Sequence, residues 1–192
     1  RITPAVPFQL AKGKLPLPDS TGRSGGSYGG RGGDYMGVSG AAYGAALRPV
    51  EAGSGGISGS PTRGGGRIQL TADELLLNGT LCANGGSGGG DYTSGGSGGG
   101  ILLKVATVSG NGFVQANGGE PFSTGSQGGG AGGGGRIALY YNDDSAFTPQ
   151  SFEAAGGYVN MPGGAGTIYL ECTGTPGLLR LDNRGHVTSE AI

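Results

Sequence analysis

The chain has 192 residues, of which 49 are glycine and 10 are proline. Its formal net charge is −1, because 12 Lys and Arg residues nearly balance 13 Asp and Glu residues. The basic residues form no run, so the electrostatic footprint of a nucleic-acid-binding protein is missing. No apolar stretch approaches the roughly 20 residues of a membrane span. We therefore expect neither nucleic acid as a partner nor a membrane-spanning segment.

The N-terminal segment is rich in proline. Four prolines fall within it, at Pro4, Pro7, Pro16 and Pro18. Because proline cannot donate a hydrogen bond to a sheet, this density excludes a central strand. We predict that residues 1–22 form a cap or connector, and that residues 23–192 form one glycine-rich domain.

The next segment, residues 27–56, places tyrosines among glycine and serine, which indicates long ordered loops. Tyr28, Tyr35 and Tyr43, like Tyr92 further on, suit carbohydrate contact or subunit packing. They also suit aromatic plugs over the loop backbone, which is the favoured interpretation. Residues 29–36 fit the glycine-rich nonapeptide that binds Ca²⁺ in parallel β-rolls. Such sites need tandem copies, because the single Asp34 supplies too few oxygens. We expect no metal and no cofactor here.

From residue 64 onward the chain repeats itself. The clearest pair is Gly64-Gly65-Gly66-Arg67-Ile68-Gln69-Leu70 and Gly133-Gly134-Gly135-Arg136-Ile137-Ala138-Leu139. The four copies start near residues 64, 98, 133 and 163. Aligned on Ile68, Leu102, Ile137 and Ile168, they repeat every 31 to 35 residues. A second apolar block follows each of these, as in Leu81-Cys82-Ala83 and Val114-Gln115-Ala116.

These short blocks predict strands, because they are rich in Ile, Leu, Val and Tyr and are bounded by glycine. A repeat of about 34 residues fits the stacking of solenoid proteins. We therefore predict an all-β fold, a parallel β-solenoid with long glycine-rich loops, in which each strand pairs with its counterpart in the next repeat. The glycines would serve at tight corners, or as extended glycine helices packed backbone to backbone.

The turn after the first copy contains Asn78-Gly79-Thr80, an acceptor sequence for N-glycosylation. Asn-Gly is also an ordinary turn dipeptide, so chance occurrence is the alternative. Asn78 is the candidate glycan attachment site.

Residues suited to catalysis or metal binding are sparse. Cys82 and Cys172 could be two buried thiols, one bridge or links to other subunits. These two cysteines, far apart in the sequence, and the single His186 are too few ligands for a His/Cys zinc site. The charged residues that a polysaccharide-cleaving β-helix would use are Asp143, Asp144, Glu153, Glu171, Asp182, Arg136 and Arg180. Asp143 and Asp144 are adjacent and indicate a solvated turn. We predict no catalytic residue.

The order of the blocks resembles the glycine-rich repeat regions of large secreted or cell-surface proteins, which are similar to parallel β-helices of the pectin-lyase type. The residues that carry the resemblance include Gly64-Gly65-Gly66-Arg67-Ile68, Ala83-Asn84-Gly85-Gly86, Gly134-Gly135-Arg136-Ile137-Ala138-Leu139-Tyr140-Tyr141 and Gly164-Ala165-Gly166-Thr167-Ile168-Tyr169-Leu170. It covers residues 23–185. It implies a β-helix fold and an extracellular or cell-surface location, and it carries over no catalytic residue.

These observations predict an extracellular structural or adhesive protein that is not an enzyme, and whose segments stack into a filament, surface layer or matrix. Its expected partners are copies of itself or neighbouring domains of an extracellular assembly, with polysaccharide as a further candidate. The alternative is a carbohydrate-binding or carbohydrate-cleaving β-helix protein, either a lyase or a hydrolase. An ice-binding protein is disfavoured, because Thr71, Thr80 and Thr107 do not share a phase of the repeat.

Overall fold

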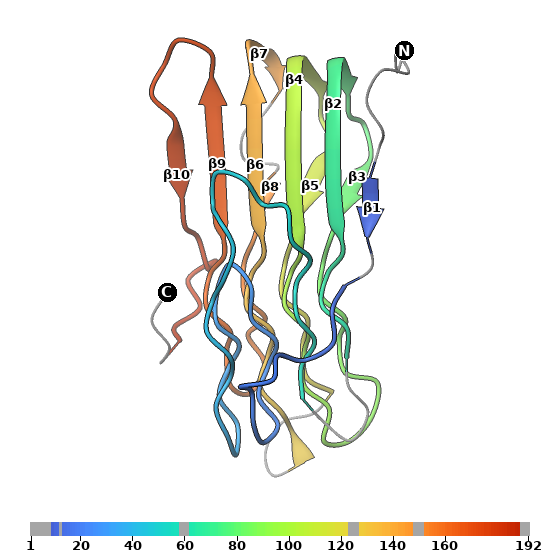
Figure 1. Ribbon diagram of the computed structural model, residues 1–192, viewed down its shortest axis with the longest axis vertical. Coiled ribbons are helices and arrows are strands. Elements are labelled where there is room, and N and C mark those ends of the chain that lie inside the picture. The colour runs from blue at the N-terminus through green and yellow to red at the C-terminus, as the bar shows by residue number, and fades with distance from the viewer. Residues whose placement is uncertain (1–8, 12, 58–61, 123–126, 148–151, 189–192) are drawn as a thin grey trace.

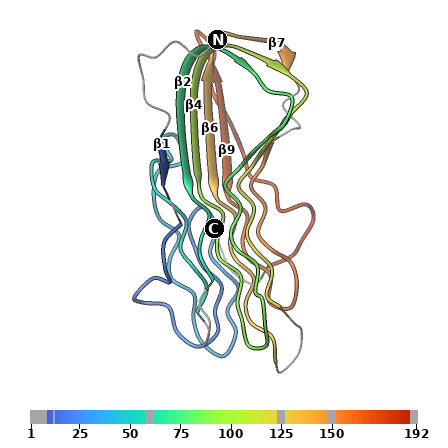
Figure 2. The same cartoon turned by 90° about the vertical axis from the view of Figure 1, so that its right-hand side faces the viewer.

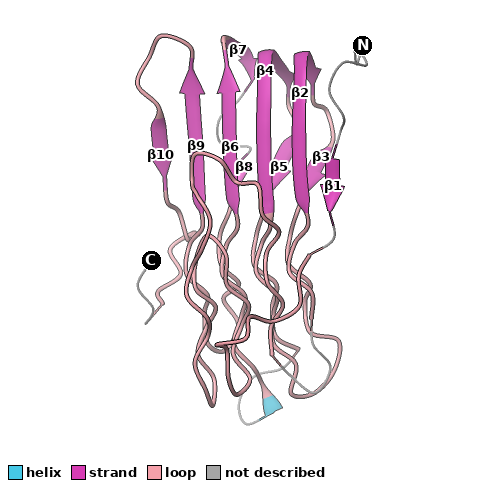
Figure 3. Ribbon diagram, in the orientation of Figure 1, coloured by secondary structure: helices cyan, strands magenta, loops and turns pink. Residues whose placement is uncertain are grey.

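A computed structural model describes residues 9–11, 13–57, 62–122, 127–147 and 152–188. The molecule is elongated, with strands in one half and glycine-rich segments in the other (Figures 1 and 3). The strands are β1 (Gln9–Ala11), β2 (Arg67–Leu76), β3 (Thr80–Cys82), β4 (Gly100–Gly110), β5 (Phe113–Gln115), β6 (Arg136–Tyr141), β7 (Asp143–Phe147), β8 (Phe152–Glu153), β9 (Thr167–Cys172) and β10 (Leu178–Arg180).

The larger sheet has the strand order β1-β2-β4-β6-β9-β10, and β7 pairs with β4 off this path. Its central strands β2, β4, β6 and β9 are parallel and come from the four copies of the repeat. The edge strands β1 and β10 run antiparallel to their neighbours. A smaller parallel sheet, in the order β3-β5-β8, comes from the second apolar blocks.

The predicted parallel β-solenoid is wrong. The larger sheet is mixed, because β1 and β10 are antiparallel, and the structure shows neither a solenoid nor a closed sheet among the residues it describes. The long returns of the repeat are largely glycine, which offers no side chains with which another sheet face could be packed. The division of the chain at residue 22 stays a prediction, although β1 lies before it and pairs with β2.

The register of the parallel strands differs by one residue from the sequence alignment. Ile68 pairs with Ile101, and Ile101 pairs with Ile137, so Leu102 is not the equivalent position. A shift of one residue turns a side chain to the other face of a sheet. Ile101 is accordingly part of the core cluster, whereas Leu102 is buried outside it.

The hydrophobic core lies between the two sheets. The larger sheet contributes a row of isoleucines that are paired across four strands, Ile68, Ile101, Ile137 and Ile168. The smaller sheet contributes Val114 and Phe152, which are 1% and 2% exposed. These inward positions recur once per repeat, so each added copy lengthens the same core.

The glycine-rich half is held by backbone hydrogen bonds with a period of three residues. In the segment 130–135, donors three residues apart bond to the same neighbouring segment: Gly130 and Gly133 to Arg23 and Gly26, Ala131 and Gly134 to Met161 and Gly164, and Gly132 and Gly135 to Gly119 and Ala116. Three residues per turn is the geometry of an extended polyproline-II-type helix, which has no internal hydrogen bonds. Of the two predicted uses of glycine, backbone-to-backbone packing of extended helices therefore operates in this half, where the segments run side by side (Figures 1 and 2).

Glycine is required in this bundle because of close approach. A Cβ atom built on Gly98 would lie 1.9 Å from the carbonyl oxygen of Ala116. No real Cβ contact is that short, so any side chain there would push two segments apart.

Candidate functional site

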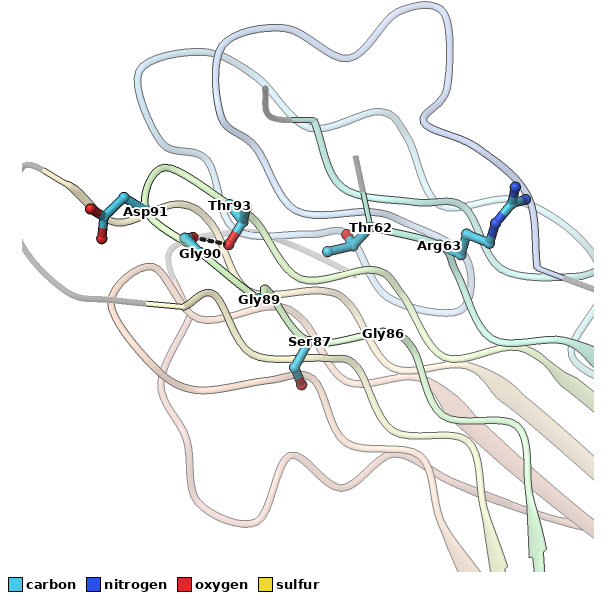
Figure 4. Close-up of a pocket in the computed structure, with 8 residues that line it drawn as sticks. All are labelled: Thr62, Arg63, Gly86, Ser87, Gly89, Gly90, Asp91 and Thr93. Atoms are coloured by element: carbon cyan, nitrogen blue, oxygen red, sulfur yellow. Dashed lines mark hydrogen bonds between the residues drawn. The ribbon is translucent and has the colours of Figure 1, made fainter. Parts of the chain in front are cut away.

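A hollow of about 460 Å³ lies in the glycine-rich half. Two backbone segments form its walls, and Figure 4 shows their residues: Thr62, Arg63, Gly86, Ser87, Gly89, Gly90, Asp91 and Thr93. A volume of this order is typical of small-molecule sites, which span roughly 300 to 1,000 Å³.

The loop that forms one wall is fixed by hydrogen bonds to the neighbouring repeat. The N–H of Gly88 donates to the carbonyl of Glu120 at 2.8 Å, and the N–H of Glu120 donates to the hydroxyl of Ser87 at 3.2 Å. Tyr92 has a φ of 63°, a conformation that is rare for a bulky residue. Its N–H donates to the carbonyl of Gln127, and its ring lies 4.3 Å from the guanidinium of Arg23. The wall is thus preorganised.

The middle of the hollow is lined by main chain. A Cβ atom added at Gly89 or Gly90 would meet nothing within 4 Å, so these glycines border open space. The side chains of Arg63 and Asp91 lie at opposite ends of the labelled set (Figure 4). Hydroxyls and peptide groups can donate to and accept from a polar ligand. The arrangement therefore suits binding of a hydroxylated molecule. It brings no two carboxylates together, as the acid–base chemistry of glycoside hydrolysis would require.

A second cluster of polar groups lies where the segment 43–52 covers the outer face of the larger sheet (Figure 1). The phenol of Tyr28 is fully buried and donates to Oε2 of Glu51 at 3.3 Å. Burial, followed by the charge of Glu51, raises the pKa of Tyr28 and of Tyr43 above the ordinary value. Burial lowers the pKa of Arg136, whose Nε donates to the carbonyl of Tyr43 at 2.9 Å. These contacts fasten the segment to the sheet.

The structure brings three of the predicted charged residues together. Glu153, Arg180 and Asp182 line one cavity with Arg184, but it measures only about 20 Å³, which is room for a single water molecule. Glu153 pairs with Arg184 and also accepts a hydrogen bond at 2.9 Å from Nε2 of Gln115. The cluster therefore fastens the C-terminal segment to β8.

The other charged candidates lie apart from this cluster. Glu171 accepts a hydrogen bond at 2.6 Å from the hydroxyl of Tyr169, and this bond, more than burial, raises the pKa of Tyr169 to about 12. Asp143 starts β7 and is exposed. The predicted turn at Asp143 and Asp144 is wrong, because the structure places both residues in this strand. The side chain of Asp144 is outside the described ones.

The predicted glycan site, Asn78, is exposed and lies in the turn between β2 and β3. Its attachment of a glycan stays a prediction. Cys82 is exposed and Cys172 is half-buried, and both are free thiols, so neither the bridge nor a pair of buried thiols is present. The ring of His186 packs 4.7 Å from the ring of Tyr158.

The segment that matched a calcium-binding nonapeptide is held by other contacts. Oδ1 of Asp34 accepts a hydrogen bond at 2.6 Å from the N–H of Ser39 and lies 3.7 Å from the guanidinium of Arg31. Across the described ranges, no group of three His, Cys, Asp or Glu residues lies together as a metal site would require. Nor does any helix in those ranges have the length and apolar character to cross a membrane.

The sequence did not indicate the hollow. Its lining is mainly glycine, serine and threonine, residues that occur throughout the chain, and its two walls come from the separate segments 62–63 and 86–93. Only Asp91 and Tyr92, which interrupt the glycine runs, marked the loop as distinct.

Comparisons with known proteins found no matching family model, curated protein or solved structure. The resemblance to glycine-rich, pectin-lyase-type repeat regions therefore stays a prediction.

Proposed function

We propose that this chain is an extracellular structural or adhesive module without catalytic activity, which acts as a stiff element and presents loops at one end. The observation that carries the proposal is the bundle of glycine-rich segments. Its hydrogen bonds join stretches that are far apart in the sequence, such as Gly26 to Gly95 and Gly30 to Gly134.

This bundle suits a mechanical role. Successive N–H groups of the segment 130–135 bond to three different neighbours, so this segment cannot be pulled away without breaking bonds to all three. Among the described residues, the same network leaves few glycine-rich stretches without backbone hydrogen bonds for a protease to bind, which is an advantage outside the cell.

The charged residues also support a module without catalysis. Glu153 is engaged by Gln115 and Arg184, and Glu171 is engaged by Tyr169. Carboxylates that take part in such internal contacts stabilise the fold.

Two measurements test the proposal. Electron microscopy with an antibody against the chain on unpermeabilised source material is expected to label the surface, and labelling only after permeabilisation would contradict the extracellular location. A reducing-end and unsaturated-product assay on a polysaccharide panel is expected to show no turnover. Turnover that is lost in Glu171→Gln or Glu153→Gln would contradict the non-enzymatic assignment.

The hollow between Thr62 and the loop 86–93 favours a second function, carbohydrate binding. Saturation-transfer NMR with glucose, galactose, N-acetylglucosamine and glucuronate tests it. Gly89→Val would fill the hollow without a clash, because nothing lies within 4 Å of its Cβ position. The same substitution at Gly79, which is equally open, is the matched control. Signals that persist in Gly89→Val would place any binding elsewhere.

A further inference from the structure

The two sheets differ in how their edge strands are covered by other parts of the chain. In the larger sheet, β1 pairs with β2 along one edge and β10 pairs with β9 along the other. In the smaller sheet, β8 is covered by the C-terminal segment, since Arg180 donates to the carbonyl of Phe152 and Arg184 pairs with Glu153. Within the described residues, β3 is paired only with β5, so its other edge is open.

The direction of the backbone groups on this edge follows from the register. The N–H of Phe113 donates to the carbonyl of Gly79 at 2.8 Å, and the N–H of Ala83 donates to the carbonyl of Gln115 at 2.7 Å. Backbone groups of alternate residues point to opposite sides of a strand. The N–H and C=O groups of Thr80 and Cys82 therefore point away from β5. Both residues are exposed.

An asparagine contact repeats along this sheet. Oδ1 of Asn84 accepts a hydrogen bond at 2.7 Å from the N–H of Asn117. Oδ1 of Asn117 accepts one at 2.9 Å from the N–H of Ala155. Each asparagine therefore holds the backbone of the following repeat. The N–H of Asn84 occupies the equivalent position on the open edge, where the described residues supply no such oxygen.

We propose that the open edge of β3 is a docking site for a parallel extended strand of a partner polypeptide that carries an asparagine opposite Asn84. The strand would add to β3 as β3 adds to β5, by hydrogen bonds to Thr80 and Cys82. Its asparagine would accept from the N–H of Asn84. Continuity with the β3-β5-β8 ladder defines the partner sequence, which resembles the chain's own residues 111–118.

A second folded copy fits less well, because its matching strand end is not free. The outer side of β8 is occupied by residues 180–184 of the same chain, and Asn183 accepts a hydrogen bond at 2.8 Å from the N–H of Gly156. The inference concerns the partner and holds whether or not the module is adhesive.

The test uses the full chain, under reducing conditions, and a fluorescent peptide of residues 111–118. Saturable binding is expected by fluorescence anisotropy. Cys82→Pro removes an N–H that points to the open side and adds a ring there, which edge strands tolerate. It is expected to keep the wild-type thermal unfolding curve and to weaken binding at least tenfold, whereas Cys82→Ala keeps the affinity.

A peptide with Asn117→Ala tests the asparagine separately and is expected to bind about fivefold more weakly, the worth of one net hydrogen bond. Equal binding to wild type and Cys82→Pro, or binding of a scrambled peptide, would overturn the proposal. Concentration-dependent dimers of the chain that are lost in Cys82→Pro, without peptide binding, would assign the edge to a second copy and overturn it also.

Discussion

At the scale of single residues, two equivalent turns differ in one position that matters for glycosylation. Asn78-Gly79-Thr80 and Asn111-Gly112-Phe113 occupy the same place in successive repeats, and both asparagines are exposed. Only the first has the hydroxyl-bearing residue that the acceptor sequence requires.

Expression through a eukaryotic secretory pathway is therefore expected to add a glycan at Asn78. Mass spectrometry before and after treatment with peptide-N-glycosidase measures it. Asn78→Gln should abolish the mass difference, and Asn111→Gln should leave it intact. Secreted protein without a glycan would show that the sequence is only a turn.

The buried phenol of Tyr28 makes stability sensitive to high pH. Its pKa is raised by burial and by Glu51, so in the unfolded chain the phenol ionises near pH 10, before it does in the folded chain. The stabilisation is complete below about pH 10 and is lost as the pH rises toward the folded pKa. Between about pH 9 and about pH 11, the wild type should lose about 1 kcal/mol more than Tyr28→Phe. Urea unfolding at both pH values measures the difference, and equal losses would contradict the burial argument.

The roles of individual tyrosines could be predicted only as alternatives. Tyr28 is fully buried and Tyr43 donates its hydroxyl to the carbonyl of Ala52, so both are plugs over the loop backbone. Tyr92 has similar glycine-rich neighbours in sequence and is 43% exposed. Neighbouring residues cannot distinguish these cases, because burial depends on segments that are far away in the chain.

At the scale of elements, the strands followed from the repeat because their apolar blocks are bounded by glycine. The register of β4 did not, since Ile101, Leu102 and Leu103 are all apolar and period-two alternation is hidden there. The edge strand β10 pairs antiparallel within a hairpin, and the pattern of the parallel repeat could not indicate that reversal.

The packing of the glycine-rich segments makes the effect of a single methyl group depend on its place. Gly98→Ala would bring a Cβ to 1.9 Å from the carbonyl oxygen of Ala116, and Gly89→Ala would meet nothing within 4 Å. We expect Gly98→Ala to destabilise the fold by about 3 kcal/mol or more. Gly89→Ala should change stability by less than about 0.5 kcal/mol. Chemical unfolding curves measure both, and similar curves would contradict close packing as the reason for glycine.

At the scale of the whole molecule, the two halves are continuous. The glycines that precede β2, β4, β6 and β9 lead directly into these strands, as Gly135 leads into Arg136 at the start of β6. The sequence repeat indicated that successive copies stack. It could not indicate which glycine-rich segments bond to one another, because those partners are brought together only in the folded chain. The hollow and the open edge of β3 were not predictable for the same reason.

This continuity predicts a single cooperative unfolding transition. Circular dichroism, which follows the strands, and tyrosine fluorescence, which follows the surroundings of the eight tyrosines, should give coincident midpoints. Two separated midpoints would contradict a single cooperative unit.

The bundle also has a calorimetric consequence. Its segments contact one another mainly through peptide hydrogen bonds, so unfolding it exposes polar backbone with little apolar surface. Apolar exposure raises the heat capacity and polar exposure lowers it, and typical domains gain about 12–15 cal/mol/K per residue. This chain should fall below that range in scanning calorimetry. Its free energy of unfolding would then vary less with temperature than that of a protein with an ordinary core, so the fold would lose little stability in the cold.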